Sequence, residues 1–302
     1  MNNKPDMTIV IPTYNRVILL EKSLNSILNQ SYSNIEIIIG DNHSYDGTEE
    51  LCQKYLNEDK RIKYFRHDKN IGLQQNTQFL VNQSSSDYTS IICDDDWISS
   101  NYSEKIIKLF KANEDCVIVS PTTWLYKEDY SIYKKCDTIN FIQDFPHERM
   151  RHYIKYGVNN LVANVCYKTP LLIKSFKNVK KRFCEDQLII LKMLYLGKCL
   201  SSQDVIYHKL NNGCTKDLEA LKRNWNLPEE ITHQNYWEYL AREYMDSVLY
   251  DEFYNDKLSE YDKIKLAVKL YEITKDNYFP AQIPHKKKSL VQSVIDKARG
   301  KV

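Results

Sequence analysis

Short apolar runs alternate with stretches of helical periodicity along the first 120 residues. Runs rich in β-branched residues, which we expect to form strands, are Thr8–Ile11, Ile35–Ile39, Ile62–Phe65, Thr89–Ile92 and Val117–Val119. Apolar positions with helical spacing lie between them, at Leu20, Leu24, Ile27 and Leu28 and at Leu73, Phe79 and Leu80. This alternation predicts a mostly parallel sheet flanked by helices, and such sheets bind ligands beyond the carboxyl ends of their strands.

The rest of the chain divides into two further regions. Residues 121–215 are less regular and contain a clear helix over Asp186–Leu196. Strand-like pieces in this region are Asn164–Tyr167 and Asp204–Tyr207. Residues 216–302 are charged and helical, with proline breaks. We therefore predict an α/β protein whose residues 1–120 and 121–215 are two halves of one sheet domain, followed by a helical C-terminal region.

The charge balance and the cysteines exclude several classes of protein. Lysine and arginine total 42 against 40 acidic residues, which argues against a nucleic-acid partner held by counterion release. Eight cysteines are spread singly without a C-x-x-C pair, which predicts reduced thiols rather than a zinc site. The polar start of the chain and the short apolar run after it predict no signal sequence and no membrane span, and so a cytoplasmic protein.

Three consecutive carboxylates, Asp94, Asp95 and Asp96, directly follow the fourth apolar run. Adjacent carboxylates repel one another, so a cation or several hydrogen-bond donors must keep them ionised together. Their oxygen ligands suit Mn²⁺ or Mg²⁺, either of which can bridge to a diphosphate. A solvated acidic turn that caps the next helix is the alternative. The position after a buried strand favours the metal.

Polar segments also follow the first three strands. After the first, Tyr14 offers an aromatic face to a nucleobase and Arg16 a guanidinium to phosphate, although such a segment is more often a turn and helix start. After the second, Asp41 has an oxygen to accept the imide N–H of uracil. The cap of the next helix fits Asp46, Gly47 and Thr48. Residues after the third strand that can close over a nucleotide are Asn70, Gly72 and Asn76.

Together these four motifs resemble the N-terminal half of the family 2 glycosyltransferases of GT-A fold, over residues 7 to 120. The resemblance implies that Pro12, Tyr14 and Asp41 contact the nucleoside, usually uridine. It also implies that Asp94 and Asp95 hold the ribose, the metal and the diphosphate. Many relatives read Asp-x-Asp-Asp here, and an alignment on Trp97 puts Cys93 at the first aspartate. Asp95 is then the first choice for metal ligand, with Asp96 beside it.

Two later residues gain roles from the same resemblance. Family members place a Glu-Asp or Asp-Asp pair where this chain has Glu185 and Asp186, which implies that Asp186 is the general base. Helix capping is the alternative, and the residues alone favour it. Relatives often carry a His or Arg near the diphosphate where His208 stands, so His208 is a candidate third metal ligand, although a lone histidine after a strand is more often structural.

The function implied is an inverting glycosyltransferase that uses Mn²⁺ or Mg²⁺. Its donor would be a UDP-hexose or UDP-N-acetylhexosamine, and its acceptor a glycan or lipid-linked glycan in surface polysaccharide biosynthesis. Composition alone points to acceptor contacts at Tyr126, Tyr130, Tyr133 and Tyr153. A nucleotidyltransferase is the first alternative, but the loop after the first strand lacks the glycines that hold a triphosphate. A non-catalytic nucleotide- or sugar-binding module is the second, and it would need no base.

The C-terminus carries lysines and arginines interleaved with an apolar stripe over residues 286–302. Such a basic amphipathic segment can lie on an anionic membrane, where lipid-linked acceptors reside. A helix docked on its own domain, or a frayed terminus, is the commoner outcome. The aromatic C-terminal helices are also a candidate surface for a homodimer.

Overall fold

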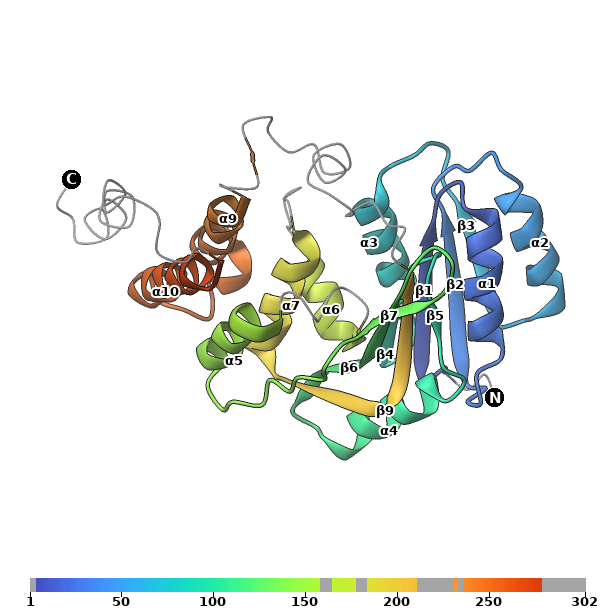
Figure 1. Cartoon of the computed structure of the whole chain (residues 1–302). Helices are drawn as coiled ribbons and strands as arrows, with labels where there is room; N and C mark the ends of the chain where they lie inside the picture. The colour runs from blue at the N-terminus through green and yellow to red at the C-terminus, as the bar shows by residue number, and fades with distance from the viewer. Residues whose placement is uncertain (1–3, 158–164, 178–183, 211–230, 233–235, 279–302) are drawn as a thin grey trace.

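The computed structural model describes residues 4–157, 165–177, 184–210, 231–232 and 236–278 (Figure 1). One curved sheet runs through the molecule, and a group of helices at the C-terminal end lies beside α5 and α7, away from the N-terminal strands. The strands are β1 Met7–Thr13, β2 Ile35–Asp41, β3 Ile62–Arg66, β4 Tyr88–Ile91, β5 Trp97–Ile98, β6 Cys116–Tyr126, β7 Ile132–Lys135, β8 Cys166–Lys168 and β9 Lys198–Leu210.

The strand order is β3-β2-β1-β4-β8-β6-β9-β5, with β7 paired to β6. Strands β1, β2, β3 and β4 pair in parallel with one another, as the alternation predicted. Strand β8 is antiparallel to both β4 and β6, and β6 and β9 are parallel to each other. The carboxyl ends of β1, β2 and β4 therefore lie at one edge of the sheet. The segments that carry the candidate residues follow these strands and lie at the same edge.

Helices cover both faces of the sheet. They are α1 Val17–Leu28, α2 Thr48–Glu58, α3 Leu73–Gln83, α4 Tyr102–Ala112, α5 Pro146–His152, α6 Thr169–Phe176, α7 Glu185–Leu196, α9 Tyr236–Tyr250 and α10 Glu260–Tyr278. Alternate residues of each strand point to opposite faces, so Ile9 and Ile37 pack with α1, α2 and α4, whereas Val10 and Ile38 pack with α3 and α7. The predicted α/β fold with a helical C-terminal region is confirmed.

Two strands are longer than their sequence suggests. Strand β6 continues to Tyr126, and β9 begins at Lys198, because the two pair in parallel along most of their length with shifts in register. The partner strand satisfies the backbone groups of their polar residues, which the hydrophobic pattern does not reveal. The boundary predicted at residue 120 falls inside β6, and the three predicted regions remain predictions. Among the described helices, none combines the length and apolar composition needed to cross a bilayer.

The C-terminal helices α9 and α10 pack on each other and are tied to α7 by polar contacts. The Lys192 ammonium of α7 is buried and lies 2.6 Å from Asp251 Oδ2, and it donates a hydrogen bond to Ser175 O at 3.2 Å. The Tyr244 hydroxyl of α9 donates to Gln187 Oε1, next to the predicted base. Tyr244 is therefore buried in its own chain, which leaves it no part in a dimer surface.

Removing the Asp251 carboxylate should destabilise the protein strongly. In Asp251→Ala the Lys192 charge remains buried without its carboxylate, and breaking a buried pair in this way costs about 3 kcal/mol or more. The free energy of unfolding, measured by urea denaturation, should fall accordingly. Asp256→Ala removes an exposed partner of Lys257 and should leave that free energy nearly unchanged. Equal losses in the two variants would contradict the importance of the buried pair.

Candidate active site

The turn after β1 and the acid cluster after β4 meet at the carboxyl edge of the sheet. Arg16 Nη1 lies 2.9 Å from Asp95 Oδ2 and 3.2 Å from Asp94 Oδ1. Thr13 Oγ1 donates a hydrogen bond to Asp94 Oδ2 at 2.8 Å. The sequence analysis did not single out Thr13. Segments nearly 80 residues apart thus form one polar site, because β1 and β4 are neighbours in the sheet.

The three carboxylates of this site are shielded from water, with exposed fractions of 5% for Asp94, 9% for Asp95 and 2% for Asp96. Burial raises the pKa of Asp94 to about 6, although the Arg16 charge opposes that rise. Burial raises the pKa of Asp96 to about 7, and the nearby Asp95 charge adds to the rise. A buried group of acids with raised pKa values favours a cation beside it.

One group of ligand atoms converges within this cluster. Cys93 Sγ and carboxylate oxygens of Asp95 and Asp96 all lie within 4.8 Å of one another. Two carboxylates suit Mn²⁺ or Mg²⁺, and a thiolate is a softer ligand that suits Mn²⁺ better than Mg²⁺. The two carboxylates therefore fit a divalent cation, with Cys93 Sγ beside them, and the assignment of Asp95 and Asp96 as metal ligands remains a prediction.

Asp96 is also held by strand β9. The Tyr207 hydroxyl donates to Asp96 Oδ2 at 2.7 Å, and the Leu210 backbone N–H donates to Asp96 Oδ1 at 2.9 Å. Each carboxylate oxygen accepts one of these bonds and has a second lone pair. No sequence pattern indicates this link, because it depends on where β9 lies in the sheet.

His208 is not part of the converging group. It pairs with Trp97 in the β5–β9 register, and its ring stacks on the indole at 5.2 Å between centroids. The Tyr126 hydroxyl and His208 Nδ1 are 2.7 Å apart. Burial lowers the pKa of His208 to about 4, and the Lys22 charge lowers it further, so the imidazole is neutral near pH 7. Its predicted role as a third metal ligand remains a prediction without support from this geometry.

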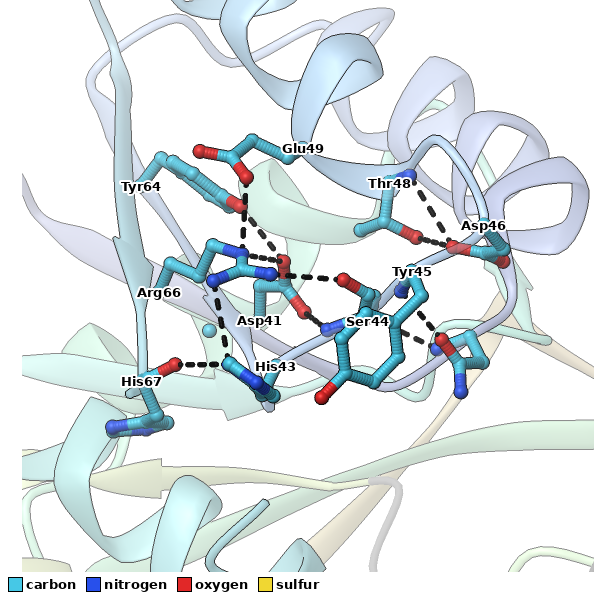
Figure 2. A network of polar contacts seen from close by, with 12 residues as sticks. Asp41, His43, Ser44, Tyr45, Asp46, Thr48, Glu49, Tyr64, Arg66 and His67 are labelled. Atoms are coloured by element: carbon cyan, nitrogen blue, oxygen red, sulfur yellow. Dashed lines mark hydrogen bonds and ion pairs between the residues drawn. The ribbon is translucent and has the colours of Figure 1, made fainter. Parts of the chain in front are cut away.

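The segment after β2 is built around a buried Asp41 (Figure 2). The Ser44 N–H donates to Asp41 Oδ1 at 2.8 Å, and the Tyr64 hydroxyl donates to Asp41 Oδ2 at 2.8 Å. Arg66 of β3 lies 3.4 Å from the same carboxylate and 3.1 Å from Glu49 of α2. The side chain of Asp41 is 0% exposed, so the nucleobase of a donor would reach it only after neighbouring side chains move. Its contact with uracil remains a prediction.

The loops after β2 and β3 are locked to each other. Asn42 Nδ2 donates to Asn70 Oδ1 at 2.8 Å, and the Gly72 N–H donates to the same oxygen at 2.8 Å. Asn76 Nδ2 donates to Gly40 O at 2.7 Å, and its Oδ1 lies 3.0 Å from a His67 ring nitrogen. Asn70 and Gly72 are exposed, but Asn76 is only 1% exposed and its amide is already bonded within the protein. The contacts predicted between these three residues and the nucleotide of the sugar donor remain predictions.

The turn after β1 leaves an aromatic face open. Tyr14 is 41% exposed, whereas Pro12 is buried in β1 opposite Gly40 of β2. Asp46 Oδ2 accepts a hydrogen bond from the Val17 N–H at the start of α1, and Asp46 Oδ1 accepts one from the Thr48 hydroxyl at the start of α2. The predicted capping role of Asp46 is confirmed, and it serves two helices.

Asp186 is the second residue of α7 and is half-buried. Burial raises the pKa of its carboxyl above the usual value, and the Gln187 backbone and the Lys209 charge partly oppose that rise. A carboxylate with a raised pKa suits a general base. Burial raises the pKa of the Cys93 thiol, and the Lys209 charge opposes the rise in the pKa of both Cys93 and Asp96.

An aromatic hairpin borders the acid cluster. Lys22 Nζ lies 3.5 Å from the ring centroids of both Trp97 and Tyr130, so it joins α1, β5 and the β6–β7 turn. Tyr130 and Tyr133 are 46% and 44% exposed, as acceptor contacts require. Tyr126 is mostly buried against His208. The prediction for Tyr153 is wrong, because this ring is fully buried and packs on Phe141.

Comparisons with known proteins agree with this geometry. The family described as glycosyl transferase family 2 matches residues 8–167. The GalNAc(5)-diNAcBac-PP-undecaprenol beta-1,3-glucosyltransferase of Campylobacter jejuni is 34% identical over 125 residues, which cover 41% of this chain and 40% of that protein. The abequosyltransferase RfbV of Salmonella typhimurium is 41% identical over 98 residues, which cover 32% of this chain and 29% of that protein. The chain thus matches less than half the length of these curated relatives.

Solved structures share the fold. Staphylococcus aureus TarS 1–349 in complex with UDP-GlcNAc superposes with a TM-score of 0.65 at 15% identity, over 97% of this chain and 80% of that chain. The mannosyltransferase PcManGT of Pyrobaculum calidifontis, in complex with GDP-Man and Mn²⁺, superposes with a TM-score of 0.54 at 12% identity, over 99% of this chain and 81% of that chain. The GT-A fold is confirmed. With its family match covering residues 8–167, more than half of its length, the chain belongs to glycosyl transferase family 2.

Proposed function

We propose that the chain transfers a hexose or N-acetylhexosamine from a UDP donor to a glycan or lipid-linked glycan acceptor, with inversion at the anomeric carbon. The convergence of Arg16 with Asp94 and Asp95 at the sheet edge is the observation that carries this proposal. The TarS complex with UDP-GlcNAc supports the UDP donor, and the undecaprenol-linked glycan for which the Campylobacter jejuni relative is named supports the lipid-linked acceptor. We place this chain in surface polysaccharide biosynthesis, at the cytoplasmic side of the membrane.

The donor site proposed here uses the exposed and the charged groups at the sheet edge. Tyr14 stacks on the base, Pro12 shapes the turn beneath it, and Arg16 turns from the carboxylates toward the diphosphate. A divalent cation held by Asp95, Asp96 and Cys93 would neutralise charge on that diphosphate. The PcManGT complex with Mn²⁺ supports a metal of this kind.

Asp186 is the base in this proposal. As the acceptor hydroxyl attacks the anomeric carbon, its proton passes to the Asp186 carboxylate, and the carbon–oxygen bond to the phosphate breaks on the opposite face. The electron pair of that bond stays on the departing nucleoside diphosphate. The exposed rings of Tyr130 and Tyr133 are the proposed surface for the acceptor sugar.

Two further proposals concern association. The basic stretch 286–302, proposed for peripheral membrane contact, lies outside the described residues. The homodimer likewise remains a proposal.

The two alternative functions have less support. The family match favours a glycosyltransferase over both a nucleotidyltransferase and a non-catalytic binding module.

Titration calorimetry with UDP tests the donor site. Wild-type protein should bind UDP more tightly with Mn²⁺ than without it, and Asp95→Ala should lose that dependence because it lacks a carboxylate of the converging group. Asp87→Ala, which removes an exposed partner of Lys4, is the matched control and should behave as wild type. A UDP dissociation constant that is the same with and without Mn²⁺ in wild-type protein and both variants would count against the metal site.

Asp186→Asn should separate catalysis from donor binding. Turnover should fall about 10²- to 10⁴-fold, since the base is lost, while the UDP dissociation constant stays within a factor of about two. In wild-type protein kcat should fall as pH drops through the raised pKa of Asp186, at a higher pH than for an ordinary aspartate, and should level off above it. Asp204→Asn, at an exposed position of β9, is the control. Full activity in Asp186→Asn would overturn the assignment.

Arg16→Met should make the protein more responsive to Mn²⁺. The guanidinium and the ion compete for the same carboxylates, so Mn²⁺ should raise the melting temperature more in the variant than in wild-type protein. The comparison uses thermal unfolding at pH 8, where the carboxylates are ionised. Arg61→Met removes an arginine before β3, at the opposite edge of the sheet, and should respond to Mn²⁺ as wild type does. An equal response in all three proteins would show that Arg16 and the ion do not share ligands.

A further inference from the structure

Lys209 occupies a position on β9 beside the acid cluster. Alternate residues of a strand point to opposite faces, so Lys209 lies on the same face as Tyr207, and His208 lies on the other. The Tyr207 hydroxyl reaches Asp96 at 2.7 Å, whereas His208 stacks on Trp97. The half-buried Lys209 side chain therefore points to the acid side of the strand.

The backbone around Lys209 is held by the cluster itself. Asp96 accepts hydrogen bonds from the Tyr207 side chain and from the Leu210 N–H at 2.9 Å. One of these residues precedes Lys209 in β9 and the other follows it. In agreement, the positive charge of Lys209 lowers the pKa of Asp96 and of Asp186 against the larger effect of burial. Lys209 thus lies on β9 between the two residues that bond Asp96, one of the proposed metal ligands.

The cations of this site differ in what they contact. Arg16 is paired with Asp94 and Asp95, and Lys22 lies between the Trp97 and Tyr130 rings. The Lys209 backbone pairs with β6, but its ammonium forms no hydrogen bond and no ion pair with any residue that the structure describes. An ammonium that holds no anion of the protein can donate charge-assisted hydrogen bonds to an anionic ligand.

We propose that Lys209 binds the terminal phosphate of the donor's nucleoside diphosphate. This inference rests on the proposed function, which requires a diphosphate beside Asp95 and a sugar beside Asp186. When the bond between the anomeric carbon and the phosphate oxygen breaks, its electron pair stays on that oxygen, and the Lys209 ammonium donates a hydrogen bond to the charge that develops. Lys209 keeps its own proton throughout.

Nucleotide affinities with Mn²⁺ test the assignment. In Lys209→Met the UDP dissociation constant should rise about 10- to 100-fold, as expected for a lost charge-assisted hydrogen bond, while the UMP dissociation constant stays nearly constant because UMP lacks the terminal phosphate. Lys209→Arg should recover most of the UDP affinity. Lys198→Met removes a lysine at the far end of the same strand, where it pairs with Asp115, and should bind both nucleotides as wild type does.

The outcomes separate this inference from the donor proposal. Equal UDP affinity in Lys209→Met and wild-type protein overturns the role of Lys209 and leaves the UDP site standing. Equal losses for UMP and UDP overturn the assignment to the terminal phosphate, and a lowered melting temperature would then indicate a structural role. GDP, CDP and ADP are titrated in parallel, since a contact to phosphate is independent of the base. If wild-type protein binds none of the four diphosphates, the donor proposal and the role of Lys209 both fail.

Discussion

Repulsion among three adjacent buried carboxylates is the constraint around which this site is arranged. Asp94, Asp95 and Asp96 are each less than 10% exposed, and burial raises the pKa of Asp94 and of Asp96. The protein offsets the cost from two directions: Arg16 and Thr13 bond the first two carboxylates, and β9 supplies two donors to Asp96. A divalent cation would complete the same balance, so the features that stabilise the cluster are those that suit it to a diphosphate.

Strand β9 connects this cluster to the rest of the molecule. It pairs with β6 along most of its length and with β5 directly after the acids, so its course fixes the positions of Tyr207, His208 and Lys209 together. Helix α7, which carries Asp186, precedes β9 in the chain and is braced by α9 through Tyr244 and Gln187. The C-terminal helices, far from the donor residues in sequence, thereby support the helix of the proposed base.

Polar residues at strand ends serve two purposes that a sequence pattern does not separate. Tyr14 and Asn70 are exposed at the edge where a nucleotide would lie, whereas Asp41 and Asn76 face inward and hold the loops in place. The tight packing behind these loops explains the difference: a Cβ atom on Gly40 would lie 2.5 Å from Asn76 Oδ1. An inward role does not oppose function, because loops fixed in this way preorganise the exposed residues.

The sequence by itself determined the strands of the N-terminal half, the α/β class and the chemistry of the acid cluster. These features follow from local periodicity and from residue type, which are properties of neighbouring positions. Tertiary structure decided which side chains meet. His208 stacks on Trp97, and Tyr153 is buried. Thr13 and Cys93 lie in the site, and Lys209 is on the face of β9 from which Tyr207 bonds Asp96. The physical reason is register, since a shift of one residue in the pairing of β9 would exchange the faces of Tyr207, His208 and Lys209, and no local pattern fixes that pairing.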